Sequence, residues 1–407
     1  MTAAFALSAL SALAVAPLAP FLLESLRLSR AHVGFFLPAV YLGGVLMALP
    51  AGWLTDLLGV RRTLGLGQLL TGAMVALAGL TGSLPLMLCC LVVAGFGFSV
   101  ANPATGRAIV EWFPARERGM AMGIKQTGLT IGGILGSLLL PPIALRLGWQ
   151  FAFLFTGAFS AVWIVCWLTL YRRPQDDPKL SPLELAHILS DPPETSAKIA
   201  WSSLLAHRQT WTFLLGKFLT DPIWWFFLFW LPKFFSTVHG VSLLGLRLPL
   251  IVIYNSATIG SIFGGWLAAR LIQAGWTVNR ARKTAMLVCA IAVVPVMLAP
   301  RIQSLWGAVA LISVAVAAHQ GWSANLFTLA SDMFPRNAVA SVVGIGSFGG
   351  AIGGALIATF TGFLLQATHS YVPIFLIAGS AYLVALLIIQ SLCPGLQPLS
   401  ETVKPIV

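Results

Sequence analysis

Charge is scarce in this chain of 407 residues. Asp, Glu, Lys and Arg make up 9% of it and hydrophobic residues 58%, whereas about 25% of the residues of a soluble domain are charged. An ordinary soluble globular protein is therefore excluded. Strict alternation of polar and apolar residues is also missing from the long apolar runs. This excludes the strands of about 10 residues that build an outer-membrane barrel.

Motifs of enzyme chemistry are absent as well. The sequence has no nucleotide-binding loop, no catalytic triad and no cluster with metal-ligand spacing. Its five cysteines lie in or beside apolar runs and have no metal spacing with histidine, so we interpret them as small packing residues. We therefore expect a protein that is not an enzyme and that binds neither a cofactor nor a metal.

What the chain has instead is a series of apolar runs of about 20 residues, the length that crosses a hydrocarbon core as a helix. Backbone groups in lipid must form hydrogen bonds within their own segment, so these spans are helical. The first run begins almost at Met1 without a basic region, so we interpret it as a span and not as a cleaved signal. We predict an all-α membrane protein with twelve transmembrane helices, at about 3–24, 33–55, 63–82, 84–113, 118–144, 149–171, 210–237, 248–273, 283–300, 302–333, 338–366 and 371–393.

The net charge of +12 does not indicate a nucleic-acid partner, because the basic residues are scattered over short loops and form no single stripe. If both termini are cytoplasmic, most of the Lys and Arg residues in the loops face the cytoplasm, as the positive-inside rule requires. We therefore predict a multi-pass protein of the cell inner (plasma) membrane, with both termini cytoplasmic and the lipid bilayer around it.

One long polar stretch, at about 172–209, leaves six spans on each side. It predicts an N-terminal six-helix bundle at 1–171, a cytoplasmic linker at 172–209, a C-terminal six-helix bundle at 210–393 and a cytoplasmic tail at 394–407. Inside the linker, Ser181-Pro182-Leu183-Glu184 has the pattern that begins a short surface helix.

The two halves of the chain repeat each other. Gly52-Trp53-Leu54 matches Gly265-Trp266-Leu267 at an offset of 213, and Glu111-Trp112-Phe113-Pro114 matches Asp332-Met333-Phe334-Pro335 at an offset of 221. Both copies of each segment lie at cytoplasmic ends, so we predict two parallel six-helix repeats. In transporters with such repeats, the substrate site lies between the halves near the bilayer midplane.

The segment from Gly52 to Arg62 lies between the second and third spans and has the form Gly-x-x-x-Asp-x-x-Gly-x-Arg-Arg. It resembles the signature of the major facilitator superfamily of secondary transporters, although Leu57 and Val60 stand at two of its usual basic positions. The resemblance implies that Asp56 faces the start of the eleventh span when the transporter is open outward. The gating residues it implies are Gly52, Asp56, Gly59, Arg61, Arg62, Glu111, Asp332 and Arg336.

The second half of the chain resembles one particular branch of this superfamily. Its polar segments, from about 215 to 365, are similar to the hexuronate and aldonate (sugar acid) branch of the anion:cation symporter family: Lys217 to Trp225, Tyr254 to Ser261, His319 to Asn325, Ser331 to Arg336 and Ala340 to Gly346. The first half departs from that family. Its first span lacks the usual Asp-Arg pair, and Phe98 falls near the place of the common Glu, so the usual proton carriers are absent.

Charge inside a span costs about 2.5–3.5 kcal/mol or more on insertion scales and therefore marks a candidate site. Arg107 and Lys125 lie at similar depth in neighbouring antiparallel spans, where they could hold a carboxylate. The alternative for Arg107 is an ion pair with Glu111 one turn on. Lys125 has no acid at that spacing.

Lys217 and Asp221 share one helix face, either as a structural ion pair or as the pair that couples transport to protons. Other candidate substrate ligands are polar or aromatic side chains within spans: Gln126, Asn255, His319, Gln320, Asn325 and Trp225. Sugar hydroxyls are suitable partners for buried amides. Bonds between helices are the alternative for the polar residues, and an interface belt for Trp225.

These observations predict a monomeric secondary transporter that imports a small organic anion, such as a hexuronate or aldonate, by proton symport and alternating access. The alternatives are a carrier of an inorganic or aromatic anion, a drug–proton exporter and a non-transporting sensor, because fold alone does not decide function. Export of lipophilic cations predicts an acidic cavity, whereas Arg107 and Lys125 make this one basic. A sensor would usually need an added signalling domain.

Overall fold

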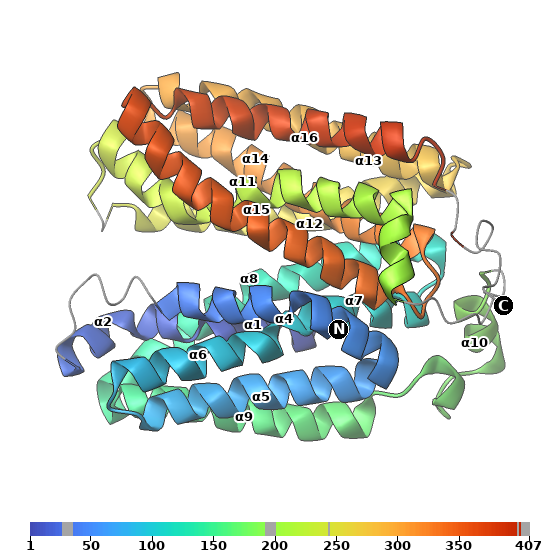
Figure 1. Cartoon of the computed structure of the whole chain (residues 1–407), viewed down its shortest axis with the longest axis horizontal. Coiled ribbons are helices and arrows are strands. Elements are labelled where there is room, and N and C mark those ends of the chain that lie inside the picture. Colours follow the sequence, from blue (N-terminus) through green and yellow to red (C-terminus); the bar gives the residue numbers. More distant parts are fainter. Residues whose placement is uncertain (27–35, 192–200, 243–244, 397–398, 400–407) are drawn as a thin grey trace. The chain divides into compact units, whose positions relative to one another are not determined.

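The structure, a computed structural model, describes residues 1–26, 36–191, 201–242, 245–396 and 399. Within these residues every regular element is a helix and there is no strand (Figure 1), so the predicted all-α fold is confirmed. Residues 33–35 of the second predicted span, 192–200 of the predicted linker, and 397–398 and 400–407 of the predicted tail lie outside the described residues.

The helices follow the predicted spans in order. They are α1 (Thr2–Leu13), α2 (Val15–Ser25), α4 (Phe36–Leu58), α5 (Val60–Leu80), α6 (Leu84–Ser99), α7 (Ala101–Trp112), α8 (Ala115–Leu147), α9 (Trp149–Leu170), α10 (Pro182–Ile188), α11 (Arg208–Val238), α12 (Arg247–Gln273), α13 (Val278–Val293), α14 (Leu305–Met333), α15 (Val339–Thr368) and α16 (Val372–Leu392). Short 3-10 helices cover Pro174–Asp176, Trp201–Ala206 and Val294–Arg301. By length and composition, eleven helical segments of the described chain can cross a membrane, and Thr2–Leu18 is a shorter apolar helix.

Three predicted spans are not single α-helices. The helix breaks between α1 and α2 and between α6 and α7, and it changes to a 3-10 helix after α13. Each break lies just before a proline, at Pro17, Pro103 and Pro295. Because proline has no N–H and its ring collides with the carbonyl four residues earlier, the regular helix ends there.

The described chain forms two compact units. Unit 1 contains 1–112, 128–190 and 336–344, and unit 2 contains 113–127, 191–335 and 345–407. The division into two bundles, a linker and a tail stays a prediction.

The short helix predicted inside the linker is confirmed as α10. Its capping box joins Ser181 and Glu184, and the hydrogen bonds from the Ser181 N–H and hydroxyl lower the pKa of the Glu184 carboxyl.

In unit 1, α5 packs against α6 and α9, and α4 packs against α6. The α4–α6 contact needs glycine, because a Cβ on Gly43 would meet the carbonyl of Val92, and one on Gly95 would meet the carbonyl of Val40. Small residues of this kind let membrane helices approach closely.

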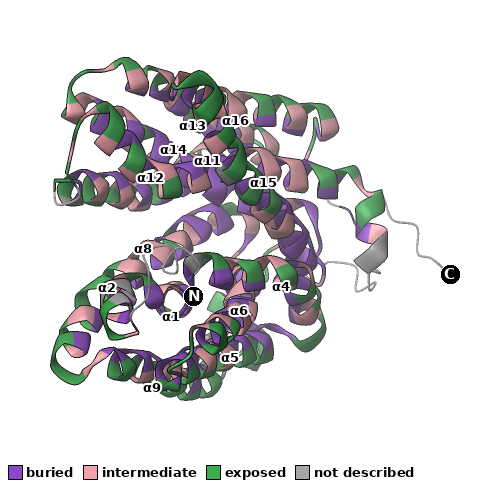
Figure 2. Cartoon of the chain, turned by 60° about the vertical axis from the view of Figure 1, so that its left-hand side comes forward, coloured by how far each residue is buried: buried purple, intermediate pink, exposed green. Residues whose placement is uncertain are grey.

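In unit 2, α14 is the central helix and packs most extensively against α12. Nearly every residue of α14 from Ala315 to Ser331 is buried (Figure 2). Gly264 and Gly321 meet at the α12–α14 contact, where a Cβ on Gly264 would collide with the backbone of Gly321. Polar side chains on this part of α14 are therefore held inside the unit.

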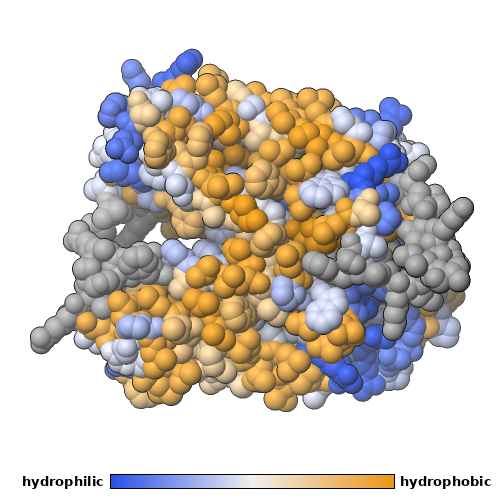
Figure 3. Space-filling view, in the orientation of Figure 1, coloured by the Kyte–Doolittle hydropathy of each residue, from blue (hydrophilic) through white to orange (hydrophobic). Residues whose placement is uncertain are grey.

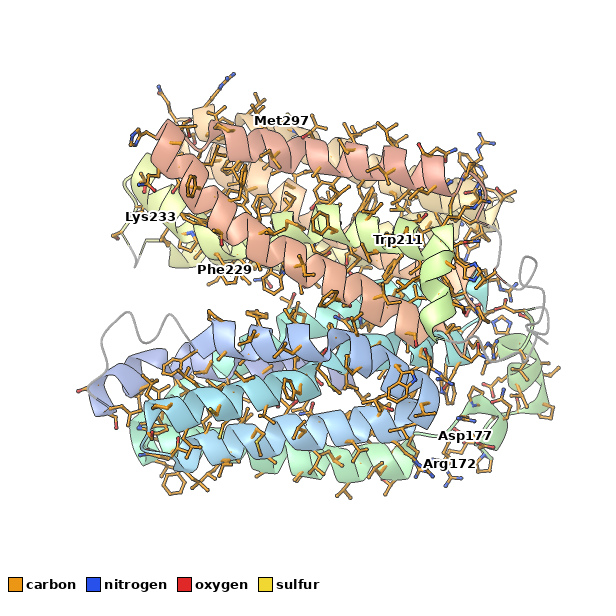
Figure 4. The ribbon with its side chains drawn as sticks, in the orientation of Figure 1. Arg172, Asp177, Trp211, Phe229, Lys233 and Met297 are labelled. Atoms are coloured by element: carbon orange, nitrogen blue, oxygen red, sulfur yellow. The ribbon has the colours of Figure 1, made fainter. Side chains whose placement is uncertain are left out.

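The surfaces of both units suit a membrane. On the face shown in Figure 3, residues of hydrophobic type cover most of the middle of each unit, and hydrophilic ones lie mainly toward the helix ends. Large apolar side chains such as Leu145, Ile259 and Phe363 are 70–75% exposed, which lipid explains and water does not. Trp211 and Lys233 lie near opposite ends of α11 (Figure 4), as expected for residues at a membrane interface.

Candidate functional site

In unit 1, the Asp56 carboxylate lies at the start of α15, the position that the resemblance implies. The Ser341 backbone N–H donates to Asp56 Oδ2 at 2.6 Å. Arg107 Nη1 donates to Asp56 Oδ1 at 3.1 Å and to the Thr55 carbonyl at 2.9 Å. Both side chains of this ion pair are about 10% exposed or less. A carboxylate is stabilised here because the first turn of a helix has unpaired N–H groups and a positive end.

Arg107 continues this network along α7. Its Nε donates to Glu111 Oε1 at 3.1 Å, and the Tyr171 hydroxyl donates to Glu111 Oε2 at 3.0 Å. The guanidinium is therefore shared between two carboxylates and a carbonyl. This arrangement favours the ion-pair alternative for Arg107 over a role in binding substrate.

The turn that follows α4 depends on Gly59. Its φ of 80° is a conformation that favours glycine. Next to it, Arg61 donates to the Leu168 carbonyl of α9, and the Arg61 carbonyl accepts from Trp167 Nε1 at 3.0 Å. Arg62 is exposed. These contacts fix the α4–α5 corner that presents Asp56.

In unit 2, Asp332, which is the repeat counterpart of Glu111, pairs with Arg282. Arg282 Nε donates to Asp332 Oδ2 at 3.1 Å, and Arg282 Nη2 donates to the Ala115 carbonyl of α8 at 3.1 Å. The Arg282 side chain has no exposed surface. Arg336 is half-buried in the connection between α14 and α15.

The buried lysines of unit 2, Lys125 and Lys217, gather at one aromatic ring. Lys217 Nζ lies 4.5 Å and Lys125 Nζ 5.1 Å from the centroid of the Phe327 ring. Lys217 donates to Asp221 Oδ2 at 2.6 Å, so the predicted ion pair between them is present. Lys125 is 1% exposed and donates to Gln126 Oε1 at 2.8 Å. Cations over an aromatic face are stabilised by its quadrupole.

A second buried cluster surrounds His319 on α14. His319 Nδ1 and the Tyr382 hydroxyl of α16 are 2.6 Å apart, and the Trp224 indole stacks on the imidazole at a centroid distance of 5.4 Å. Gln320, the next residue on α14, is 9% exposed. The cluster joins polar and aromatic groups from α11, α14 and α16.

The other predicted ligands have different surroundings. Asn325 donates to the carbonyls of Gly264 and Gly321 at 2.9 Å each, which favours a structural bond between α12 and α14. Asn255 is exposed and donates to the Ile251 carbonyl of its own helix. Trp225 stacks on Phe229, with ring centroids 5.7 Å apart.

Several residues of these clusters were not predicted from the sequence: Tyr171, Arg282, Phe327 and Tyr382. Their partners are 50 or more residues away in the chain or on another helix, so no local pattern indicates them. In the described part of the chain, no group of three or more His, Cys, Asp or Glu side chains could hold a metal ion.

The sequence model of the Major Facilitator Superfamily matches residues 1–358. The chain belongs to this superfamily. The hexuronate transporter of Escherichia coli (strain K12) is 29% identical over 400 residues, which cover 95% of this chain and 92% of that protein. The galacturonate transporter of Dickeya chrysanthemi is 32% identical over 272 residues, 65% of this chain and 78% of that protein.

The proton:xylose symporter XylE, solved with 6-bromo-6-deoxy-D-glucose, has the same fold. The TM-score is 0.78 at 16% identity, with 98% of this chain and 96% of that chain covered. The predicted facilitator fold and the similarity to sugar acid transporters are thus confirmed. The chain is a multi-pass membrane transporter and not an enzyme.

Proposed function

We propose that this transporter imports a hexuronate or an aldonate together with a proton. The observation that carries the proposal is the buried Lys217–Asp221 ion pair, which shares the Phe327 ring with Lys125. Curated relatives that transport sugar acids support the choice of substrate.

Lys217 is the group that links the substrate to the proton. Its ammonium is 2.6 Å from Asp221. A substrate carboxylate competes with Asp221 for this cation. When the substrate carboxylate displaces Asp221 from Lys217, Asp221 is left without its partner among buried side chains, where an unpaired charge is strongly unfavourable. Asp221 then takes up a proton, so substrate and proton enter together.

Lys125 and its neighbour form the second part of the binding site. Lys125 adds a second cation for the carboxylate. Gln126 Nε2 donates to the Ser323 hydroxyl at 3.5 Å. A hydrogen bond this long is weak, so a sugar hydroxyl can replace Ser323 as the partner of Gln126. His319 and Gln320 on α14 offer further hydrogen-bonding groups, and Trp225 offers an apolar face for the sugar ring.

The Asp56 contact acts as the gate in this proposal. Asp56 on α4 holds the start of α15, a helix of the second half of the chain, through the Ser341 N–H. Breaking that contact releases the two halves at the cytoplasmic side. We propose a monomer in the inner membrane with both termini in the cytoplasm.

The proposal is tested with purified protein. A thermal-shift screen against hexuronates, aldonates, nitrate and benzoates identifies the ligand, because binding stabilises the folded state. A shift with nitrate or benzoate and none with sugar acids would support the alternative of an inorganic or aromatic anion.

Coupling is tested in proteoliposomes with the identified sugar acid. Asp221→Asn keeps the size of the side chain but cannot exchange a proton, so we expect uptake driven by a pH gradient to stop and counterflow exchange to persist. Asp176→Asn, an exposed linker variant, is the matched control. If the Asp221 variant accumulates substrate in a pH gradient at the parental rate, the proton passes elsewhere or the carrier is a uniporter.

A further inference from the structure

The two halves of the chain present equivalent contacts at their cytoplasmic ends. In unit 1, a Cβ on Gly52 of α4 would meet the backbone of Ala340 and Ser341 at the start of α15. In unit 2, a Cβ on Gly265 of α12 would meet the backbone of Gly119 and Met120 at the start of α8. These positions are related by the repeat offsets of 213 and 221, so α8 is the counterpart of α15.

The acid at this contact is present in only one of the halves. Asp56 of α4 accepts from the start of α15, but Ala269 stands at the equivalent position of α12 and offers no acceptor. The helix starts differ too. By the repeat offset α8 should begin at 118, yet it begins at Ala115, about one turn earlier.

The linker supplies the missing acid. Asp191 follows α10 in the chain and accepts the Ala115 N–H with Oδ1 and Oδ2 at 3.1 Å each. Arg118 Nη2 donates to Asp191 Oδ2 at 2.7 Å. Asp191 is thus placed at the first turn of α8 as Asp56 is placed at that of α15.

Arg118 ties this carboxylate to the rest of unit 2. Its Nη1 donates to the Ser331 carbonyl near the end of α14 at 3.1 Å, and its Nε donates to the Phe113 carbonyl at 3.2 Å. The Arg118 side chain is 4% exposed and that of Asp191 19%. A largely buried, charge-assisted pair of this kind is stronger than a surface pair.

We propose that Asp191 is a second gating residue, carried by the linker, that holds the start of α8 in the closed arrangement at the cytoplasmic side. It takes the role for α8 that Asp56 has for α15. The linker is therefore part of the gate and not only a tether between the halves. This inference rests on the proposed alternating-access function.

The test uses full-length protein in which the five native cysteines are replaced and Ala340→Cys is the reporter. Ala340 is completely buried and belongs to the other gate contact. Labelling of this cysteine without substrate measures how often the Gly52–Ala340 contact opens. Asp191→Asn should speed labelling about three- to tenfold, the size expected when one charge-assisted bond becomes a neutral one.

Hydrogen exchange of residues 115–118 serves as the local readout. It should rise in Asp191→Asn, and Asp191→Glu, which keeps the charge, should restore both readouts in part. Asp176→Asn should change neither. Faster exchange with unchanged labelling would overturn the proposal, because Asp191 would then be a local helix cap. No change in either would also overturn it. Labelling needs no substrate, so the result stands apart from any failure to transport sugar acids.

Discussion

Replacing Asp56 with Asn removes one negative charge and keeps the size and one acceptor oxygen of the side chain. Asp56 contacts Arg107 and Ser341. Arg107 lies in the same half of the chain as Asp56, so we expect this pair to be present in both the open and the closed gate. It should then contribute nothing to the difference in free energy between them. Ser341 belongs to α15 in the other half, so in the proposed mechanism the Ser341 contact is made only when the gate is closed.

The magnitude follows from that single contact. The N–H to carboxylate distance of 2.6 Å indicates a charge-assisted bond. Exchanging it for a neutral bond loses about 1 kcal/mol, and losing the charge at the helix start adds about 0.3–1 kcal/mol. The closed gate should therefore be weakened by about 1–2 kcal/mol. This shifts the ratio of open to closed protein roughly 5- to 30-fold, since about 1.4 kcal/mol is a factor of ten.

Labelling of the buried cysteine in Ala340→Cys, in a background without native cysteines, measures this ratio. With Asp56→Asn we expect labelling to be about tenfold faster and the thermal stability of the protein to stay close to that of the parent. The exposed variant Asp176→Asn should label at the parental rate. Unchanged or slower labelling in Asp56→Asn would refute the reasoning, because the Ser341 contact would then not hold the gate closed.

Two further variants probe the gate contact and the binding site. A Cβ on Gly52 would lie 2.9 Å from Ser341 Cα, whereas one on Gly44 of the same helix meets nothing within 4 Å. Gly52→Ala should therefore speed labelling of Ala340→Cys, and Gly44→Ala should not. Equal labelling rates in the two variants would contradict this. Lys125→Ala should abolish sugar acid uptake with expression and folding near normal, while Lys179→Ala in the exposed linker should not. Normal uptake by the Lys125 variant would remove this lysine from the site.

Local chemistry made part of this structure predictable from the sequence. The helices follow from apolar runs of membrane length, and the start of α10 follows from the Ser181 and Glu184 capping box. The pairs Arg107–Glu111 and Lys217–Asp221 are four residues apart on one helix face. Each of these features needs only neighbours in the chain, so spacing alone indicates it.

Contacts between distant segments could not be predicted in the same way. Asp191 and Arg118 are 73 residues apart, and His319 and Tyr382 are 63 residues apart. Several residue types could serve as either partner, and the helix packing decides which of them meet. The Asp56 position came from the family resemblance. The start of α8 at Ala115, where Asp191 accepts the first N–H, lies three residues before the start that the repeat offset indicates, so the repeat does not predict it.

Among the ion pairs of the described chain, the choice of cation distinguishes the pairs proposed for gating from the pair proposed for coupling. Asp56, Glu111, Asp191 and Asp332 all pair with arginine. A guanidinium stays charged in proteins, so such pairs respond to movement of the helices and not to protonation of the cation. Asp221 pairs with Lys217, whose ammonium is a compact point charge on a flexible stem. A substrate carboxylate can take the place of Asp221 at this ammonium, so among these pairs Lys217–Asp221 is the one that we propose for coupling to protons.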